Sequence, residues 1–144
     1  MPQPNSSPLQ SIGLLVLRLG AAGLLFYGHG WPKITHFAER AAGFADPLHL
    51  GNHTLSLGLV VFAEVPCAFL VMLGLVTRLA LIPVVLFLMV AVIVQHAHDP
   101  WSDKEYALLY MLPFFTLLYT GPGRFALDAR LGIRLLRRRG SAQR

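Results

Sequence analysis

Residues 54–95 read TLSLGLVVFAEVPCAFLVMLGLVTRLALIPVVLFLMVAVIVQ, and this stretch decides the fold. Glu64 and Arg78 are the only charged side chains in it. A helix needs about 20 predominantly apolar residues to cross a hydrocarbon core about 30 Å thick. An apolar run of about that length lies on each side of Arg78, so we expect two spans, residues 54–76 and 79–95. The short connection makes them antiparallel neighbours.

The composition of the whole chain is that of a membrane protein. Of 144 residues, 55% are hydrophobic and 13% are charged, whereas soluble domains carry about 25% charged residues. Two more apolar segments, residues 12–31 and 106–121, are expected to span the membrane, although the second is only about 16 residues long. We therefore predict an all-α polytopic integral membrane protein, folded as a bundle of four transmembrane helices.

The segments outside the spans predict the domain organisation. Residues 1–11 contain three prolines and no charged side chain, so we expect a disordered leader with a helix start near Ser7-Pro8. The transmembrane domain then covers residues 12–123. Residues 124–144 form a basic tail, which holds seven of the twelve Lys and Arg residues of the chain.

The distribution of basic residues predicts the orientation in the membrane. With four spans, eight Lys and Arg residues flank the spans on the side of the termini and three on the other side. Because the side richer in Lys and Arg is cytoplasmic, we expect both termini in the cytoplasm and the chain in the inner cell membrane. Topology and attraction of the tail to anionic lipids then explain the net charge of +5. No nucleic-acid partner is expected.

Two ionisable residues fall inside the predicted spans, Arg18 in the first and Glu64 in the second. A charge near the centre of a bilayer costs about 3 kcal/mol on insertion scales, so intramembrane charges usually have a partner. The two residues differ in predicted height by about 9 Å at 1.5 Å per residue, which an extended arginine can largely bridge. We expect an Arg18–Glu64 ion pair, which either locks helix packing or belongs to a polar line through the bundle.

The histidines gather on one side of the predicted bundle. All six lie at or beyond the outer ends of the spans. Imidazole can bind a metal, carry a proton or donate a hydrogen bond, and a quinone or a small redox partner needs such groups. The groups expected to converge at this outer rim are His29, Lys33, His96, Glu105 and Tyr106. A metal site at His96 and His98 is the competing interpretation, although their spacing is generic.

Several short motifs follow one another along the spans and their connections. They are Leu17-Arg18-Leu19, Phe26-Tyr27-Gly28-His29-Gly30 with Lys33, Glu64, Leu73-Gly74-Leu75-Val76-Thr77-Arg78, His96, Glu105-Tyr106, and Gly121-Pro122-Gly123-Arg124 through Asp128. Their order and spacing resemble the DoxX family of small bacterial and archaeal membrane proteins over about residues 14–128. One departure is Val65-Pro66-Cys67, where members usually carry small residues or glycine after the glutamate. The resemblance implies a four-helix membrane bundle. Members have been linked to quinone-coupled sulfur oxidation and to membrane redox complexes that counter oxidative stress.

These observations favour one function and leave alternatives open. We predict an accessory subunit of a quinone-linked membrane redox or oxidative-stress system. No flavin, haem or iron–sulfur motif occurs in the sequence, so no intrinsic cofactor is expected and electrons would pass through quinone or through soluble or membrane redox subunits. The alternatives are a metal-handling or small-solute transport module and a non-catalytic membrane scaffold. A homo-oligomer is compatible with each, and the sequence alone does not decide whether the chain is an enzyme.

Overall fold

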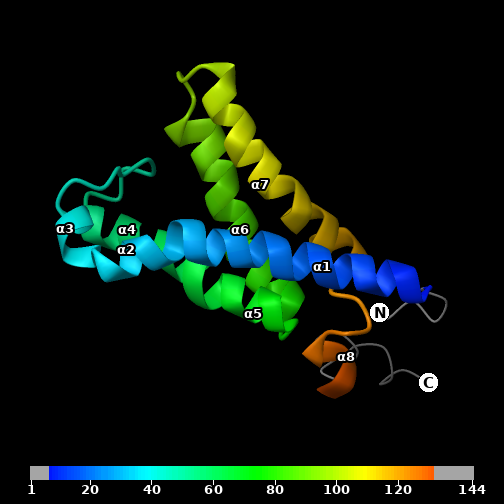
Figure 1. The fold of residues 1–144 in the computed structure, drawn as a ribbon. Coiled ribbons are helices and arrows are strands. Elements are labelled where there is room, and N and C mark those ends of the chain that lie inside the picture. Colours follow the sequence, from blue (N-terminus) through cyan, green and yellow to red (C-terminus); the bar gives the residue numbers. More distant parts are fainter. Residues whose placement is uncertain (1–6, 132–144) are drawn as a thin grey trace, which may run out of the picture.

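The computed structural model describes residues 7–131, which form helices and connections without a strand in that range (Figure 1). The predictions for residues 1–6 and 132–144, in the leader and the basic tail, lie outside the described part. Three short π-helical segments, η1 to η3, interrupt the α-helices. The elements are α1 (Pro8–Leu25), η1 (Phe26–Gly30), α2 (Trp31–Thr35), α3 (Phe37–Ala41), α4 (His53–Phe62), η2 (Ala63–Cys67), α5 (Ala68–Leu73), α6 (Thr77–Val90), η3 (Ala91–Gln95), α7 (Trp101–Thr120) and α8 (Leu127–Leu131).

Within residues 7–131, three helical stretches are long and apolar enough to cross a membrane: Pro8–Thr35, His53–Leu73 and Thr77–Gln95. They correspond to the first three predicted spans, and α1 begins near the expected position, where the Ser7 side chain caps it. The fourth segment, α7, is a helix of 20 residues that is not among these apolar stretches. The described chain is therefore all-helical with three candidate membrane spans, and the fourth crossing stays a prediction.

The first span continues through Pro32 to Thr35, past the end predicted at residue 31. In η1 the backbone hydrogen bonds reach five residues back, and the N–H of Trp31 donates to the carbonyl of Phe26. Pro32, which has no N–H group to donate, directly follows this π turn in α2. Because the helix does not stop at the proline, Lys33 lies one turn beyond His29 on the same continuous helix.

The helix α7 begins at Trp101, earlier than the expected start near Tyr106. Asp103 lies in its first turn, where a carboxylate interacts favourably with the positive end of the helix dipole. Residues 101–105, which precede the predicted fourth span, are therefore helical. This helix presents Asp103, Tyr106 and Tyr110 at positions i, i+3 and i+7, which share one face.

The helices pack around a core that α1 shares with the other spans. α1 contacts both α5 and α7, α6 contacts α7, and η1 contacts η2. Figure 1 shows α1 running across the pair formed by α6 and α7. Buried apolar side chains between them include Leu25, Leu81, Val84, Phe114 and Leu117. Large apolar side chains, among them Leu24, Leu59, Phe62 and Leu86, also cover the outside. Helices that are apolar on all sides suit a lipid environment.

Candidate functional site

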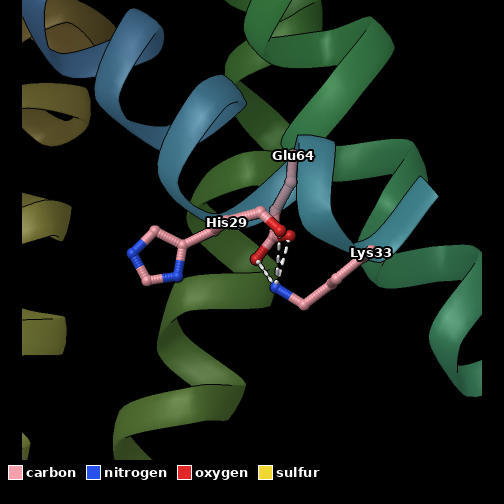
Figure 2. A network of polar contacts seen from close by, with 3 residues as sticks. All are labelled: His29, Lys33 and Glu64. Carbon is pink, nitrogen blue, oxygen red and sulfur yellow. Dashed lines mark hydrogen bonds and ion pairs between the residues drawn. The ribbon is translucent and has the colours of Figure 1, made fainter. Parts of the chain in front are cut away.

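Glu64, the buried acidic residue of the second span, is paired with Lys33 of α2 (Figure 2). The Nζ atom of Lys33 lies 2.6 Å from Oε2 and 2.8 Å from Oε1 of Glu64. The Glu64 side chain is 1% exposed and that of Lys33 is 14% exposed. The same ammonium group donates to the backbone carbonyl of His29 at 3.3 Å. Lys33 therefore has an acceptor within the protein for each of its three N–H donors.

The Arg18–Glu64 ion pair that the sequence suggested is not formed in the structure. Arg18 Nη1 donates to the carbonyl oxygen of Pro122 at 2.9 Å, and Nη2 lies 3.5 Å from that of Phe125. The physical reason is the extended first span. Because the helix runs through Pro32, it places the Lys33 ammonium group beside Glu64. The carboxylate is therefore paired without the arginine.

Gly30 explains how the first two spans come close enough for this ion pair. A Cβ atom on Gly30 would lie 2.8 Å from the backbone oxygen of Glu64 and 2.7 Å from Cγ2 of Val65, too close without a shift of the helices. The pair also lies among the π-helical segments, since Glu64 is in η2 and Lys33 follows η1. Single π turns in helices are frequent at functional sites. The close approach of the helices and the π turns therefore make this region a candidate functional site.

A cavity of about 420 Å³ opens beside the ion pair, between the first span, the third span and α7. This volume falls within the range that suits a small organic molecule. Apolar lining side chains include Leu25, Phe87 and Leu88. Polar lining side chains include His29, Lys33, Glu64, His96, Asp103 and Tyr106.

The cavity brings together most of the residues expected at the outer rim. His29, Lys33, His96 and Tyr106 line it, whereas Glu105 does not and Asp103 does. In α7, Asp103 and Tyr106 are three residues apart and share a face, and Glu105 lies on another. Asp103 was missed because the helix was expected to begin later. The i, i+3, i+7 spacing with Tyr110 is the signal that identifies it.

Both imidazoles that line the cavity, His29 and His96, have defined neighbours. Nδ1 of His96 lies 2.7 Å from Oδ2 of Asp99, in the turn that follows η3. Since a carboxylate can only accept, we assign the proton of this hydrogen bond to Nδ1. The His29 ring meets the Tyr110 ring edge-on, with centroids 5.0 Å apart and planes at 83°. Figure 2 shows the His29 ring turned away from the ion pair.

The residues suggested for a metal site do not form a cluster. Within residues 7–131, no group of three or more His, Cys, Asp or Glu side chains is arranged to hold a metal ion. His98 is not among the residues that line the cavity, and His96 is bonded to Asp99. The single cysteine, Cys67, is buried.

Arg18 belongs to a second polar group, which we call the Arg18 cluster: Arg18, Gly74, Val76, Thr77 and Asp128. The Asp128 carboxylate accepts from the N–H groups of Val76 at 2.7 Å and Thr77 at 2.9 Å, and from the Thr77 hydroxyl at 2.9 Å. These bonds cap the start of α6. Gly74 has a φ of +69°, and a Cβ atom there would collide with the Arg18 guanidinium group. The motifs at residues 73–78 and 121–128 thus form one unit.

Outside the spans, Asp46 organises the connection between α3 and α4. Its carboxylate accepts from the Ser56 hydroxyl at 2.7 Å and from the N–H groups of Leu50 at 3.0 Å and Gly51 at 2.8 Å. The hydrogen bond from Ser56, together with the two from the backbone, holds the pKa of Asp46 below that of free aspartate.

Comparison with known proteins connects these features to a family. The sequence model of the DoxX family matches residues 13–97, a range that includes Arg18, Lys33, Glu64 and His96. The chain is also similar to the Uncharacterized membrane protein Rv3486 of Mycobacterium tuberculosis (strain ATCC 25618 / H37Rv). The two are 29% identical over 126 residues, covering 78% of this chain and 77% of the relative. No solved structure matches the chain.

Proposed function

The chain belongs to the DoxX family, and we propose that it binds a quinone head group in the cavity beside Lys33 and Glu64. In this role it is an accessory subunit of a membrane redox or oxidative-stress system. One observation carries the proposal. The cavity of about 420 Å³ joins apolar walls to polar side chains from the first span, the third span and α7.

The lining residues fit the chemistry of a quinone ring. Leu25, Phe87 and Leu88 provide apolar surface for the ring. His29 and Tyr106 carry groups that can hydrogen-bond to its oxygen atoms. When bound, a quinone supplies two-electron chemistry coupled to protons, and the protein supplies binding, orientation and electrostatics.

The proposal includes the membrane setting. We propose that α7 is a fourth crossing, that both termini face the cytoplasm, and that the cavity lies toward the outer face of the inner membrane. The 20 residues of α7 extend about 30 Å at 1.5 Å per residue, and the helix packs along α1 and α6. The excess of basic residues near the termini supports the orientation. The partners implied are anionic lipids at the basic tail and separate redox subunits.

Two neighbouring histidines test the proposed function, since only His96 of the two lines the cavity. Binding of a short-chain quinone and of its quinol is measured in lipid nanodiscs, and the form that the original protein binds more tightly is used for the comparison. The His96→Ala variant should bind this form about tenfold more weakly, a change of about 1.4 kcal/mol. The His98→Ala variant should stay within about twofold of the original protein. Empty nanodiscs give the background from partition into lipid.

The same samples distinguish the alternatives. A metal-handling protein predicts that both substitutions lower the copper or zinc content measured by elemental analysis and that neither changes quinone affinity. If neither substitution changes metal content or quinone binding, the scaffold interpretation is favoured and the proposed site is rejected.

A further inference from the structure

The hydrogen-bonding groups around the cavity are unequally divided between donors and acceptors. Lys33 directs its ammonium group to Glu64 and to the carbonyl of His29. The carboxylates of Glu64 and Asp103, which also line the cavity, can only accept when ionised. A carboxylate has about four lone-pair sites, so Glu64 retains acceptor capacity beside Lys33.

The hydrogen bond between His96 and Asp99 adds another acceptor. With Nδ1–H donated to Asp99, the second nitrogen of the neutral ring, Nε2, carries a lone pair. Within residues 7–131, the hydrogen bond of the His96 side chain is the one to Asp99, which leaves Nε2 open to a ligand. Asp99 is therefore a positioning residue that fixes the tautomer of His96.

The remaining polar groups of the lining adapt to either kind of ligand. The hydroxyl groups of Tyr106 and Tyr110, the amide of Gln95 and the ring of His29 can each donate or accept. They therefore do not discriminate between a ligand with donors and a ligand with acceptors. The preference between the two kinds of ligand therefore depends on the groups that can only donate or only accept. Among these, the groups that can still bond to a ligand are acceptors.

We propose that the cavity selects the reduced, dihydroxy form of an aromatic ring over the corresponding dione. His96 Nε2 and a lining carboxylate accept hydrogen bonds from its hydroxyl groups. A dione offers only lone pairs, which repel those of the carboxylates and leave Nε2 without a donor. Sites built to bond a substrate hydroxyl reject analogues that lack it. This inference rests on the proposed function, because it names the redox form that the same site prefers.

The test measures a preference between matched ligands under anaerobic conditions. Equilibrium dialysis against the protein in nanodiscs at pH 8 compares 1,4-dihydroxynaphthalene, 1,4-naphthoquinone and 1,4-dimethoxynaphthalene, with empty nanodiscs subtracted. The dihydroxy compound should bind at least about tenfold more tightly than the other two. The dimethoxy compound controls for ring size, because it keeps the ring and loses the donors.

Three variants show whether the hydrogen-bonded pair of His96 and Asp99 causes the preference. His96→Phe should reduce the ratio between dihydroxy and dione affinities to within about threefold of unity. Asp99→Asn should reduce it as well, since an amide can also donate to Nδ1 and leave the proton on Nε2. The ¹⁵N resonances of the His96 ring report this tautomer change directly, which a merely structural role of Asp99 does not predict. His98→Gln is the matched control and should keep the ratio of the original protein.

The outcomes separate this inference from the proposed function. If the dione binds as tightly as the dihydroxy compound, the preference is rejected while the quinone site stands. If the ratio survives in both His96→Phe and Asp99→Asn, the role that this inference gives to His96 Nε2 is rejected, and the quinone site again stands. If none of the three ring compounds binds above the empty-nanodisc background, the proposed function fails and this inference fails with it.

Discussion

The first span carries two cations, Arg18 and Lys33, and their surroundings in the protein differ. Arg18 is 2% exposed, and its guanidinium group meets main-chain carbonyls and the backbone at Gly74. Lys33 is partly buried, and together with its partner Glu64 it borders a cavity of about 420 Å³. A buried charge in a membrane segment therefore does not by itself mark a functional site. Lys33 differs from Arg18 because a cavity lies beside it, lined by polar groups that can still form hydrogen bonds with a ligand.

The largest expected effect comes from breaking the Lys33–Glu64 pair. Lys33→Met leaves the carboxylate buried without its cation and should cost about 3–5 kcal/mol of unfolding free energy. The Lys33→Met/Glu64→Gln double variant removes both charges and should be more stable than the sum of the two single losses predicts. Unfolding in mixed micelles monitored by circular dichroism measures all four proteins. Simple additivity would show that the two residues are not energetically coupled.

At the Arg18 cluster, the substitution Gly74→Ala tests tight packing. An alanine in the left-handed region costs about 1–2 kcal/mol, and its Cβ would lie 2.6 Å from that of Ala126, so an overpacking cost of about 1–3 kcal/mol adds to it. The expected total is about 2–5 kcal/mol in the same unfolding assay.

Gly58→Ala is the matched control for this substitution, because nothing lies within 4 Å of a Cβ there and alanine favours a helix interior by about 1 kcal/mol. Equal losses in the two variants would contradict the packing described for the Arg18 cluster.

The smallest effect is expected in the connection between α3 and α4, through Asp46. Its pKa is lower in the folded protein than in the unfolded chain, because Ser56 and backbone N–H groups bond the carboxylate. The resulting stabilisation is present above the ordinary aspartate pKa of about 3.9 and is lost as the pH falls through the lower folded value. The amide resonances of Leu50 and Gly51 should move toward random-coil positions in that acidic range. In Asp46→Asn they should show no such transition, and an identical transition in this variant would exclude Asp46 as its cause.

The sequence predicts the spans well because apolar length is a local signal. In the described part of the chain, the three helical stretches that are long and apolar enough to cross a membrane lie within a few residues of the predicted spans. The partners of the charges were harder to predict, because a contact such as Arg18 with Pro122 joins residues far apart in the chain. Lys33 was expected at the rim, but its pairing with Glu64 depends on a helix that continues through Pro32. Neither the π turn that permits this nor the close approach at Gly30 follows from hydropathy.

The sequence predicted which residues form the candidate site better than it predicted how they are arranged. His29, His96 and Tyr106 were expected to converge, and they line one cavity. Asp103 replaces Glu105 because α7 begins at Trp101, a boundary set by Pro100 and its local turn and not by the apolar pattern.

The central claim, that the space beside Lys33 is the ligand site, is tested most directly by filling it. Ala91 lines the cavity, whereas Ile93 in the same turn is 63% exposed on the outside. Ala91→Phe should weaken binding of the 1,4-dihydroxynaphthalene ring at least about tenfold, because the added ring occupies the space, while Ile93→Phe should leave the affinity within about twofold. An unchanged affinity in Ala91→Phe, or an equal loss in both variants, would contradict the claim.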